Sequence, residues 1–299
     1  VSDSNSGTIT LTDTTDGANI LFNGAVTADT FTTAAQGYDI FFLGDATFAN
    51  AVTFQNTGTL DLGDATSDTL TFNGGLTEST SGTVTIDGAI VSSDDAITFG
   101  AITLGANTVI NAAGGAIVTG NITGTSGQDI TITSTGGSTN TALINGTIGA
   151  GGNINTITAI GSAGVAFIGN VTTNNAAGNT FTAASRDVVF NNITLDTNAA
   201  NNDGNVIVIA DAVTGTLVAD AGLAIFQLTP LTENAVIEVA NANSGVINED
   251  VFYDIDNFAV GASFALLGGS SHTGNIFVGN DLAGIAFVEA GNVQIQNSS

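Results

Sequence analysis

The sequence predicts an all-β protein, a right-handed parallel β-helix in which short strands stack coil upon coil. Three observations indicate this fold. Gly, Thr, Asn, Val and Ile dominate the composition, and these residues are poor helix formers. Short segments alternate between apolar residues and Thr, and one apolar unit returns about once every 20 residues.

The alternating segments are typical of strands. Examples are residues 8–12 (TITLT), 83–86 (TVTI) and 130–133 (ITIT), and clusters of Gly, Asn and Asp bound each of them. Successive side chains of a strand point to opposite faces of the sheet. We therefore expect Val, Ile, Leu and Phe to fill the interior and Thr to cover the outside.

The recurring unit predicts the length of one coil. It reads ILFNGAV at residues 20–26, LTFNGGL at 70–76 and VAFIGNV at 165–171. Its turn residue recurs with steps of 20, 26, 23 and 23, at Gly100, Gly120, Gly146, Gly169 and Asn192. A variable period of this size indicates a solenoid. Equivalent strands of neighbouring coils then lie about 4.8 Å apart, and Gly, Asn and Asp occupy the corners.

A change in composition divides the chain. Residues 1–221 are predicted to form the coils of about 20–26 residues. Residues 222–299 contain Pro230, the single Pro, and are richer in Glu and aromatic residues, but still contain strand-like segments. We assign 222–299 to a β-rich C-terminal region that continues the solenoid, caps it or serves as an assembly module, because a solenoid end is an open sheet edge.

The charge balance excludes several classes of function. The chain has 27 acidic residues, one basic residue other than His (Arg186) and a net charge of −26. Binding to nucleic acid depends on Lys and Arg, so we expect no nucleic-acid partner. No apolar run reaches the roughly 18 residues of a membrane helix, so we expect no direct membrane insertion. The chain has no Cys, which excludes disulfides and Cys-ligated metals.

Two identical pentapeptides raise the question of a metal site. LGDAT occupies residues 43–47 and again 62–66, a spacing of 19 that matches one coil. We therefore predict that the two copies form consecutive rungs, with Leu43 over Leu62 inside and Asp45 over Asp64 outside. Two stacked carboxylates repel unless a cation lies between them.

We predict that no cofactor is required, and calcium is the ion that these carboxylates would bind. Hard cations bind several oxygen ligands, and the candidate ligands are Asp45, Asp64, Asp196, Asp203, Asp254 and Asp256. The competing interpretation, which we favour, is that these Asp residues mainly form turns, with at most a weakly bound ion.

An enzyme is the main alternative function. Ser93-Asp94-Asp95 resembles the paired-Asp stretch of polygalacturonase-like glycosidases, and paired carboxylates catalyse glycoside hydrolysis. The Gly-His-Gly and Arg-x-Lys elements of that family are absent, and lyases of the same fold need a basic residue as catalyst. We predict that the protein is not an enzyme and assign no catalytic or cofactor-binding residue.

The degenerate coils at 70–76 and 165–171, the Gly, Asn and Thr bias and the absence of Cys resemble the passenger regions of filamentous-haemagglutinin-like and autotransporter-type bacterial adhesins. The resemblance covers about residues 1–220. It implies a non-catalytic protein at the bacterial cell surface, either an adhesin stalk or a subunit that polymerises through strand edges into a filament, sheath or layer. The implied partners are copies of the chain, neighbouring segments of a surface protein, and host or matrix glycans. Because copies of this charge repel one another, we expect salt or calcium to strengthen assembly.

Overall fold

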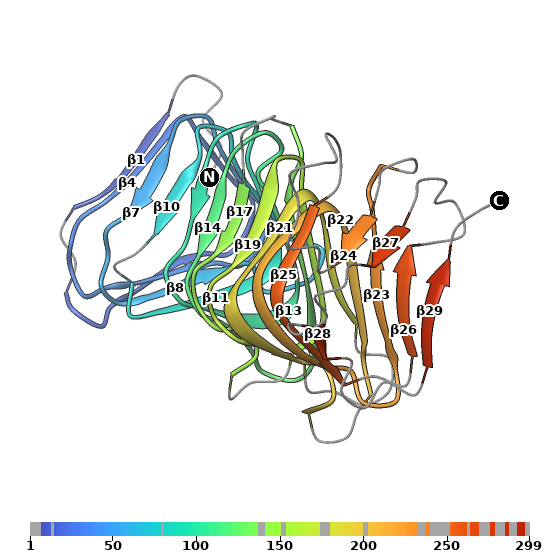
Figure 1. Ribbon diagram of the computed structural model, residues 1–299. Coiled ribbons are helices and arrows are strands. Elements are labelled where there is room, and N and C mark those ends of the chain that lie inside the picture. The colour runs from blue at the N-terminus through green and yellow to red at the C-terminus, as the bar shows by residue number, and fades with distance from the viewer. Residues whose placement is uncertain are drawn as a thin grey trace.

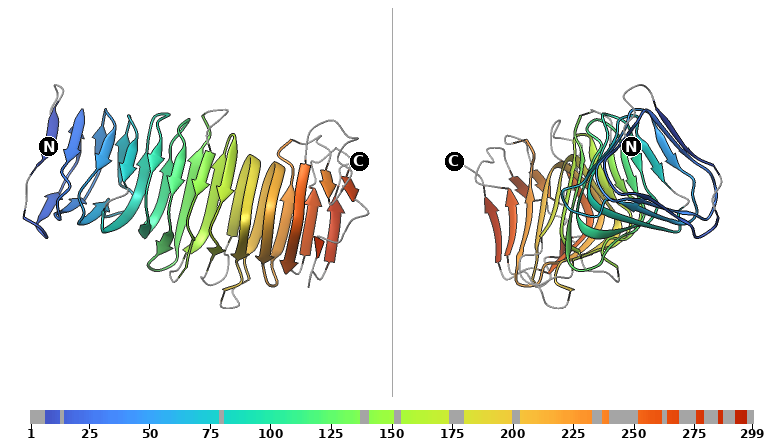
Figure 2. Two further views of the ribbon diagram at one scale, coloured as in Figure 1. Left: turned by 60° about the vertical axis from the view of Figure 1, so that its left-hand side comes forward. Right: turned by 180° about the vertical axis from the view of Figure 1, so that it is seen from behind.

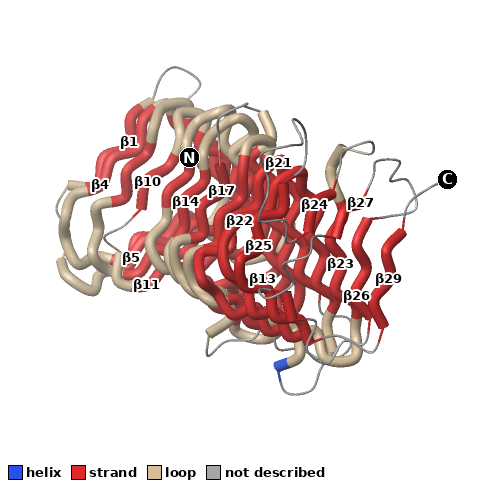
Figure 3. The backbone as a smooth tube through the Cα atoms, in the orientation of Figure 1, coloured by secondary structure: helices blue, strands red, loops and turns tan. Residues whose placement is uncertain are grey.

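The computed structural model is a rod of stacked parallel coils, which confirms the predicted β-solenoid (Figure 1). The two ends of the chain lie at opposite ends of the rod (Figure 2), and strands make up most of the backbone (Figure 3). No helix among the described residues is long and apolar enough to cross a membrane. The structure describes residues 7–12, 15–78, 81–136, 141–150, 154–173, 180–199, 203–232, 237–239, 252–261, 264–268, 276–278, 285–286 and 292–296.

Each coil contributes strands to three faces, and each face is a parallel ladder that runs along the rod. Long strands turn a corner and belong to two or three faces. Face I contains β2 (Asn19–Phe22), β5 (Asp39–Phe42), β8 (Thr59–Leu62), β15 (Ile122–Gly124), β20 (Val171–Thr172), β28 (Ile285–Ala286) and parts of β11 (Thr83–Val91), β13 (Ile102–Asn111), β21 (Thr180–Asp196), β22 (Asn205–Asp220) and β25 (Phe252–Gly261).

Face II contains β3 (Val26–Ala28), β6 (Ala46–Phe48), β9 (Thr69–Phe72), β16 (Gln128–Ser134), β18 (Ile154–Gly161), β23 (Ile225–Thr229), β26 (Phe264–Gly268), β29 (Asn292–Gln296) and parts of β11, β13, β21 and β22. Face III contains β1 (Thr8–Leu11), β4 (Thr30–Thr33), β7 (Val52–Phe54), β10 (Leu76–Glu78), β12 (Ile97–Thr98), β14 (Ile117–Thr119), β17 (Thr141–Ile144), β19 (Gly164–Phe167), β24 (Ile237–Val239), β27 (Ile276–Val278) and parts of β21, β22 and β25.

The predicted division between interior and exterior is confirmed by columns of paired residues. Ile40 and Leu60 are neighbours on face I, and both are fully buried. On the outside of face III, Thr follows Thr through five consecutive rungs, at Thr10, Thr32, Thr53, Thr77 and Thr98. Side chains alternate between the inside and the outside along each strand. Because the coils stack in register, equivalent side chains of successive coils then form a column along the rod.

Aromatic rings fill the interior of the first coils. Phe42 stacks on Phe22 with ring centroids 4.9 Å apart, and it contacts Phe31 at 5.6 Å and Phe48 at 5.9 Å. Phe31 of face III contacts Phe48 of face II at 5.1 Å and Phe54, on the next strand of its own face, at 5.9 Å. Rings from all three faces therefore meet on the axis, and this cluster joins the first coils to one another.

The ladders cross residue 222 without interruption. Val206 of β22 pairs with Phe226 of β23, and β26 and β29 follow on the same face. The strands described after residue 222 are thus part of the stack. The boundary at 222 between two domains stays a prediction.

Candidate functional site

Carboxylates and carboxamides lie mainly at the corners of the coils, where they bind the backbone of the next coil. Asp39 accepts a hydrogen bond from the Thr59 N–H at 2.6 Å, and Asp129 accepts one from the Thr156 N–H at 3.1 Å. The same contact joins the side chains of Asp16, Asp45, Asp94, Asn107, Asn121, Asn170, Asp203, Asn205 and Asp211 to the N–H groups of Gly37, Thr69, Gly114, Asp129, Thr147, Thr194, Leu223, Ile225 and Thr232.

These contacts have one direction, because the acceptor always lies one coil nearer the N-terminus than the donor. Strand ladders end at the corners and leave N–H groups there that need an acceptor. An ionised carboxylate forms a stronger hydrogen bond with N–H than a neutral acceptor does. The corners therefore give the acidic residues a structural role that requires no metal ion and no substrate.

The two LGDAT copies lie on consecutive coils, as predicted, but the predicted register, with Leu43 over Leu62 and Asp45 over Asp64, is wrong. Leu62 pairs with Phe42, so the copies are offset by one residue on face I. Ala46 pairs with Leu70, which brings Asp45 level with Thr69, whose N–H it binds at 2.9 Å. The reason is the corner length: three residues separate Phe42 from Ala46, whereas seven separate Leu62 from Leu70. Asp45 and Asp64 therefore do not form the predicted stacked pair.

The longer corner instead gathers Asp64 with three further carboxylates, those of Asp61, Asp68 and Asp87. Asp68 accepts hydrogen bonds from the Asp64 N–H at 2.8 Å and from the Ala65 N–H at 3.1 Å, which closes the loop. Asp87 comes from the next coil, at the irregularity in β11 between Ile86 and Gly88. Asp61 Oδ1 is buried and has no hydrogen-bond partner within the described part of the chain.

Burial and like charge make this corner an unfavourable place for ionised carboxylates. Burial, followed by the charges of Asp87 and Asp64, raises the pKa of Asp61 from 3.8 to about 6. Burial, followed by the charges of Asp64 and Asp68, also raises the pKa of Asp87. The folded state therefore holds a proton on Asp61 at pH values where the unfolded chain has lost it.

We expect Asp61→Asn to stabilise the protein at neutral pH and to remove part of its pH dependence. Since the pKa of Asp61 is raised on folding, its contribution favours folding below about pH 4 and is lost as the pH rises through about 6. A two-unit shift equals about 3 kcal/mol for a shielded group, and the partial exposure of Asp61 lowers our estimate to about 1–2 kcal/mol.

Urea unfolding at pH 4 and pH 7 measures this effect as the free energy of unfolding. Asp45→Asn is the matched control, because Asp45 is an exposed corner residue whose amide replacement can still accept from Thr69 N–H. An Asp61→Asn variant whose stability loss between the two pH values equals that of the wild type contradicts the prediction.

The structure brings two of the predicted calcium ligands, Asp196 and Asp203, close to Asp220 and Asn198. Asp196 pairs with Asp220 in the ladder, and Asp220 Oδ1 accepts from Asn198 Nδ2 at 3.4 Å. A Cβ atom added to Gly222 would lie 2.3 Å from Asp203 Oδ1 and 2.6 Å from Asn198 Oδ1, so both oxygens converge there. Asn198 Oδ1 is buried without a hydrogen-bond partner among the described residues.

The donor set at this corner suits a hard cation, since all of the convergent atoms are oxygens. Burial raises the pKa of Asp196, the Asn198 N–H lowers it, and the charge of Asp220 raises it again. Asp203 Oδ1 already accepts from the Leu223 N–H at 2.8 Å. In the described part of the chain, no three His, Cys, Asp or Glu side chains are grouped as a metal site.

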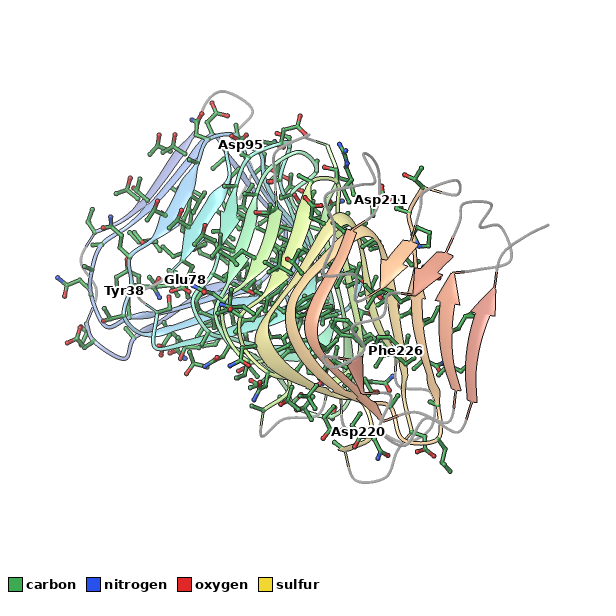
Figure 4. The ribbon with its side chains drawn as sticks, viewed as in Figure 1. Tyr38, Glu78, Asp95, Asp211, Asp220 and Phe226 are labelled. Atoms are coloured by element: carbon green, nitrogen blue, oxygen red, sulfur yellow. The ribbon has the colours of Figure 1, made fainter. Side chains whose placement is uncertain are left out.

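The remaining metal predictions fall elsewhere. Asp254 and Asp256 lie in β25, and their side chains are outside the described part of the structure. Asp220 and Asn198 were not predicted as ligands. The sequence did contain a signal for Asp220: it follows Asp196 by 24 residues, the length of one coil, which places the two carboxylates on neighbouring coils. Figure 4 shows Asp220 and Asp211 on opposite sides of the rod, so the carboxylates of successive corners do not merge into one site.

Comparisons with known proteins identify no relative. No family model matches the chain. No curated protein and no solved structure matches it either.

Proposed function

We propose that the protein is a non-catalytic, extracellular structural protein, a bacterial cell-surface β-solenoid. It serves as the stalk of an adhesin or joins to copies of itself, or to neighbouring segments of a surface protein, through strand edges. The observation that carries the proposal is the outer strand edge of the first described coil. Of the strands described, β1, β2 and β3 each pair along one edge only.

The side chains of the first coil support the same proposal. Ile20 and Phe22 are only partly buried, whereas Ile40 and Phe42, their partners one coil further on, are fully buried. Another coil on this end would bury the apolar surface of Ile20 and Phe22 and complete the backbone ladder of all three faces. Burial of apolar surface and strand addition both favour such a contact.

We expect purified chains to associate end to end, and high salt or calcium to strengthen the association by screening a charge of −26 per copy. Electron microscopy and sedimentation velocity in low salt, high salt, calcium and chelator measure the rod length. Calcium that acts beyond the effect of matched ionic strength indicates a specific site, for which the corner of Asp196, Asp203 and Asp220 is our candidate.

A pair of variants tests the edge itself. Phe22→Asp adds a charge to the half-buried interior of β2, and we expect it to abolish association through the first coil. Leu21→Asp adds the same charge to the outer side of the same strand, where Leu21 is 50% exposed, and should leave association intact. Monomeric rods in all conditions would remove the self-assembly version of the proposal.

The carboxylates of Asp61 and Asp87 favour a second candidate, a secreted enzyme acting on polysaccharide. A carboxyl group with a pKa near 6 beside other carboxyl groups resembles the acid catalyst of glycosidases. The paired Asp94 and Asp95 support it less, since Asp94 binds the Gly114 N–H at 2.8 Å as a corner acceptor. Turnover of a polysaccharide that is lost in Asp61→Asn would support the enzyme and contradict the non-catalytic proposal.

A further inference from the structure

The strands of face III are out of sequence order at the C-terminal end of the rod. β22 pairs with β25, β25 pairs on its other edge with β24, and β24 pairs with β27. Figure 1 shows β24 next to β27. The other two faces keep the sequence order, with β22, β25 and β28 on face I and β22, β23, β26 and β29 on face II.

Two strands of face III, β24 and β25, follow β22 in the chain, and the pairing shows that β24 is the one out of order. Val239 of β24 follows Val213 by 26 residues, about one coil, yet it does not pair with Val213. Val165, Val188 and Val213 occupy equivalent places on face III, with steps of 23 and 25 residues. Tyr253 pairs with Val213 but follows it by 40 residues. Val278 follows Tyr253 by 25 residues, which is one coil again. β25 and β27 are therefore separated by one coil of chain, and β24 lies between them on face III and pairs with both.

The sequences of β24 and β27 make them interchangeable at this place. β24 reads Ile-Glu-Val and β27 reads Ile-Phe-Val, and the two strands pair in register from Ile237 opposite Ile276. Glu238 lies between Phe252 on one side and Phe277 on the other. If β24 leaves, β27 can pair with β25 and place Phe277 opposite Phe252, without a change of register.

We propose that β24 is a donor strand that is exchanged with a second copy of this chain, so that each copy fills the slot between β25 and β27 of the other. The proposal rests on the self-association proposed above and adds to it a second contact, made by β24 and not by the edges of β1, β2 and β3. Exchange replaces each backbone hydrogen bond with the same bond from another chain. β24 has only three residues, so few bonds must break during the exchange.

The connections are long enough for the strand to reach another copy. Residues 230–236 join β23 to β24, and residues 240–251 join β24 to β25. At about 3.3 Å per residue, the seven residues of the first connection span up to about 23 Å and the twelve of the second up to about 40 Å. Each reach is several times the spacing of about 4.8 Å between rungs.

The absence of Cys allows a direct test with two single-Cys chains, Glu238→Cys and Phe252→Cys. Paired residues of neighbouring strands lie within disulfide range. After the two variants are mixed in high salt under mild oxidation, we expect a disulfide-linked heterodimer on a non-reducing gel, with the bond located by mass spectrometry. Thr214→Cys mixed with Asp254→Cys is the control, because this pair joins β22 to β25 and should give no heterodimer.

The outcomes separate this inference from the proposed function. Copies that associate in sedimentation experiments without a disulfide between positions 238 and 252 of different chains would overturn the exchange and leave self-association intact. Chains that stay monomeric, with the Glu238→Cys/Phe252→Cys double variant closing only within itself, would overturn both. Glu238→Pro provides a second test, since Pro cannot donate to a ladder. We expect Glu238→Pro to lose the exchanged dimer and to keep the circular dichroism of the rod, and an unaffected dimer would contradict the inference.

Discussion

Phe42→Ala is expected to destabilise the N-terminal coils by about 3–5 kcal/mol, the usual cost of removing a buried ring. Phe42 is fully buried and contacts Phe22, Phe31, Phe48 and Phe54, so its loss leaves a cavity where rings from three faces meet. The surrounding coils cannot collapse into this space without breaking their ladders. The lost stability should therefore approach the full cost of the cavity.

The effect of Phe42→Ala should be local as well as large. In a solenoid each coil contacts only its neighbours, so stability is close to a sum over adjacent coils. Hydrogen exchange should accelerate in residues 19–62 and remain unchanged in 180–220, and urea unfolding gives the free energy. Phe41→Ala is the matched control, because Phe41 lies on the outer side of the same strand and is only half-buried. Equal losses in the two variants would contradict this account of the core.

The same alternation explains how much of the fold the sequence predicts. Residues such as Leu60, Asp61 and Leu62 follow a period of two, and the structure places Leu60 and Leu62 inside and Asp61 outside. Glu78 also follows this alternation, although its side chain is acidic and the position faces inward. It pairs with Phe54 at an inward position and is buried, where its carboxylate accepts from the Ser81 N–H at 2.7 Å (Figure 4). Position within the period outweighs the cost of burial there because the corner supplies a hydrogen-bond donor.

Corner lengths, in contrast, cannot be predicted from periodicity. A corner adds residues without changing the pattern of the strands around it, and the cost of a longer loop is small. The two LGDAT copies are therefore 19 residues apart, about one coil, and yet Leu62 pairs with Phe42 and not with Leu43. For the same reason Asp61 and Asp87 were not predicted as neighbours, and nothing in the chain spacing revealed that β24 follows β25 on face III.

Gly63→Ala is expected to be the other strongly destabilising change, by about 3 kcal/mol or more. Gly63 has a φ of +92°, which costs an L-residue about 1 kcal/mol. A Cβ at this place would lie 2.0 Å from the backbone oxygen of Asp87, on the next coil. Backbone cannot move aside as a flexible side chain does, so the two coils must separate at the corner that holds the four carboxylates.

Gly24→Ala provides the matched control for Gly63→Ala. Gly24 occupies the corresponding corner one coil before the first LGDAT copy, its φ is not positive, and an added Cβ meets nothing within 4 Å. We expect Gly24→Ala to change the free energy of unfolding by less than about 1 kcal/mol. Because Gly63→Ala pushes the coils of Asp61 and Asp87 apart, it should also lower the pKa of Asp61 and reduce the fall in stability between pH 4 and pH 7. A Gly63→Ala variant as stable as Gly24→Ala would contradict the close approach of Gly63 to Asp87, on which the carboxylate corner depends.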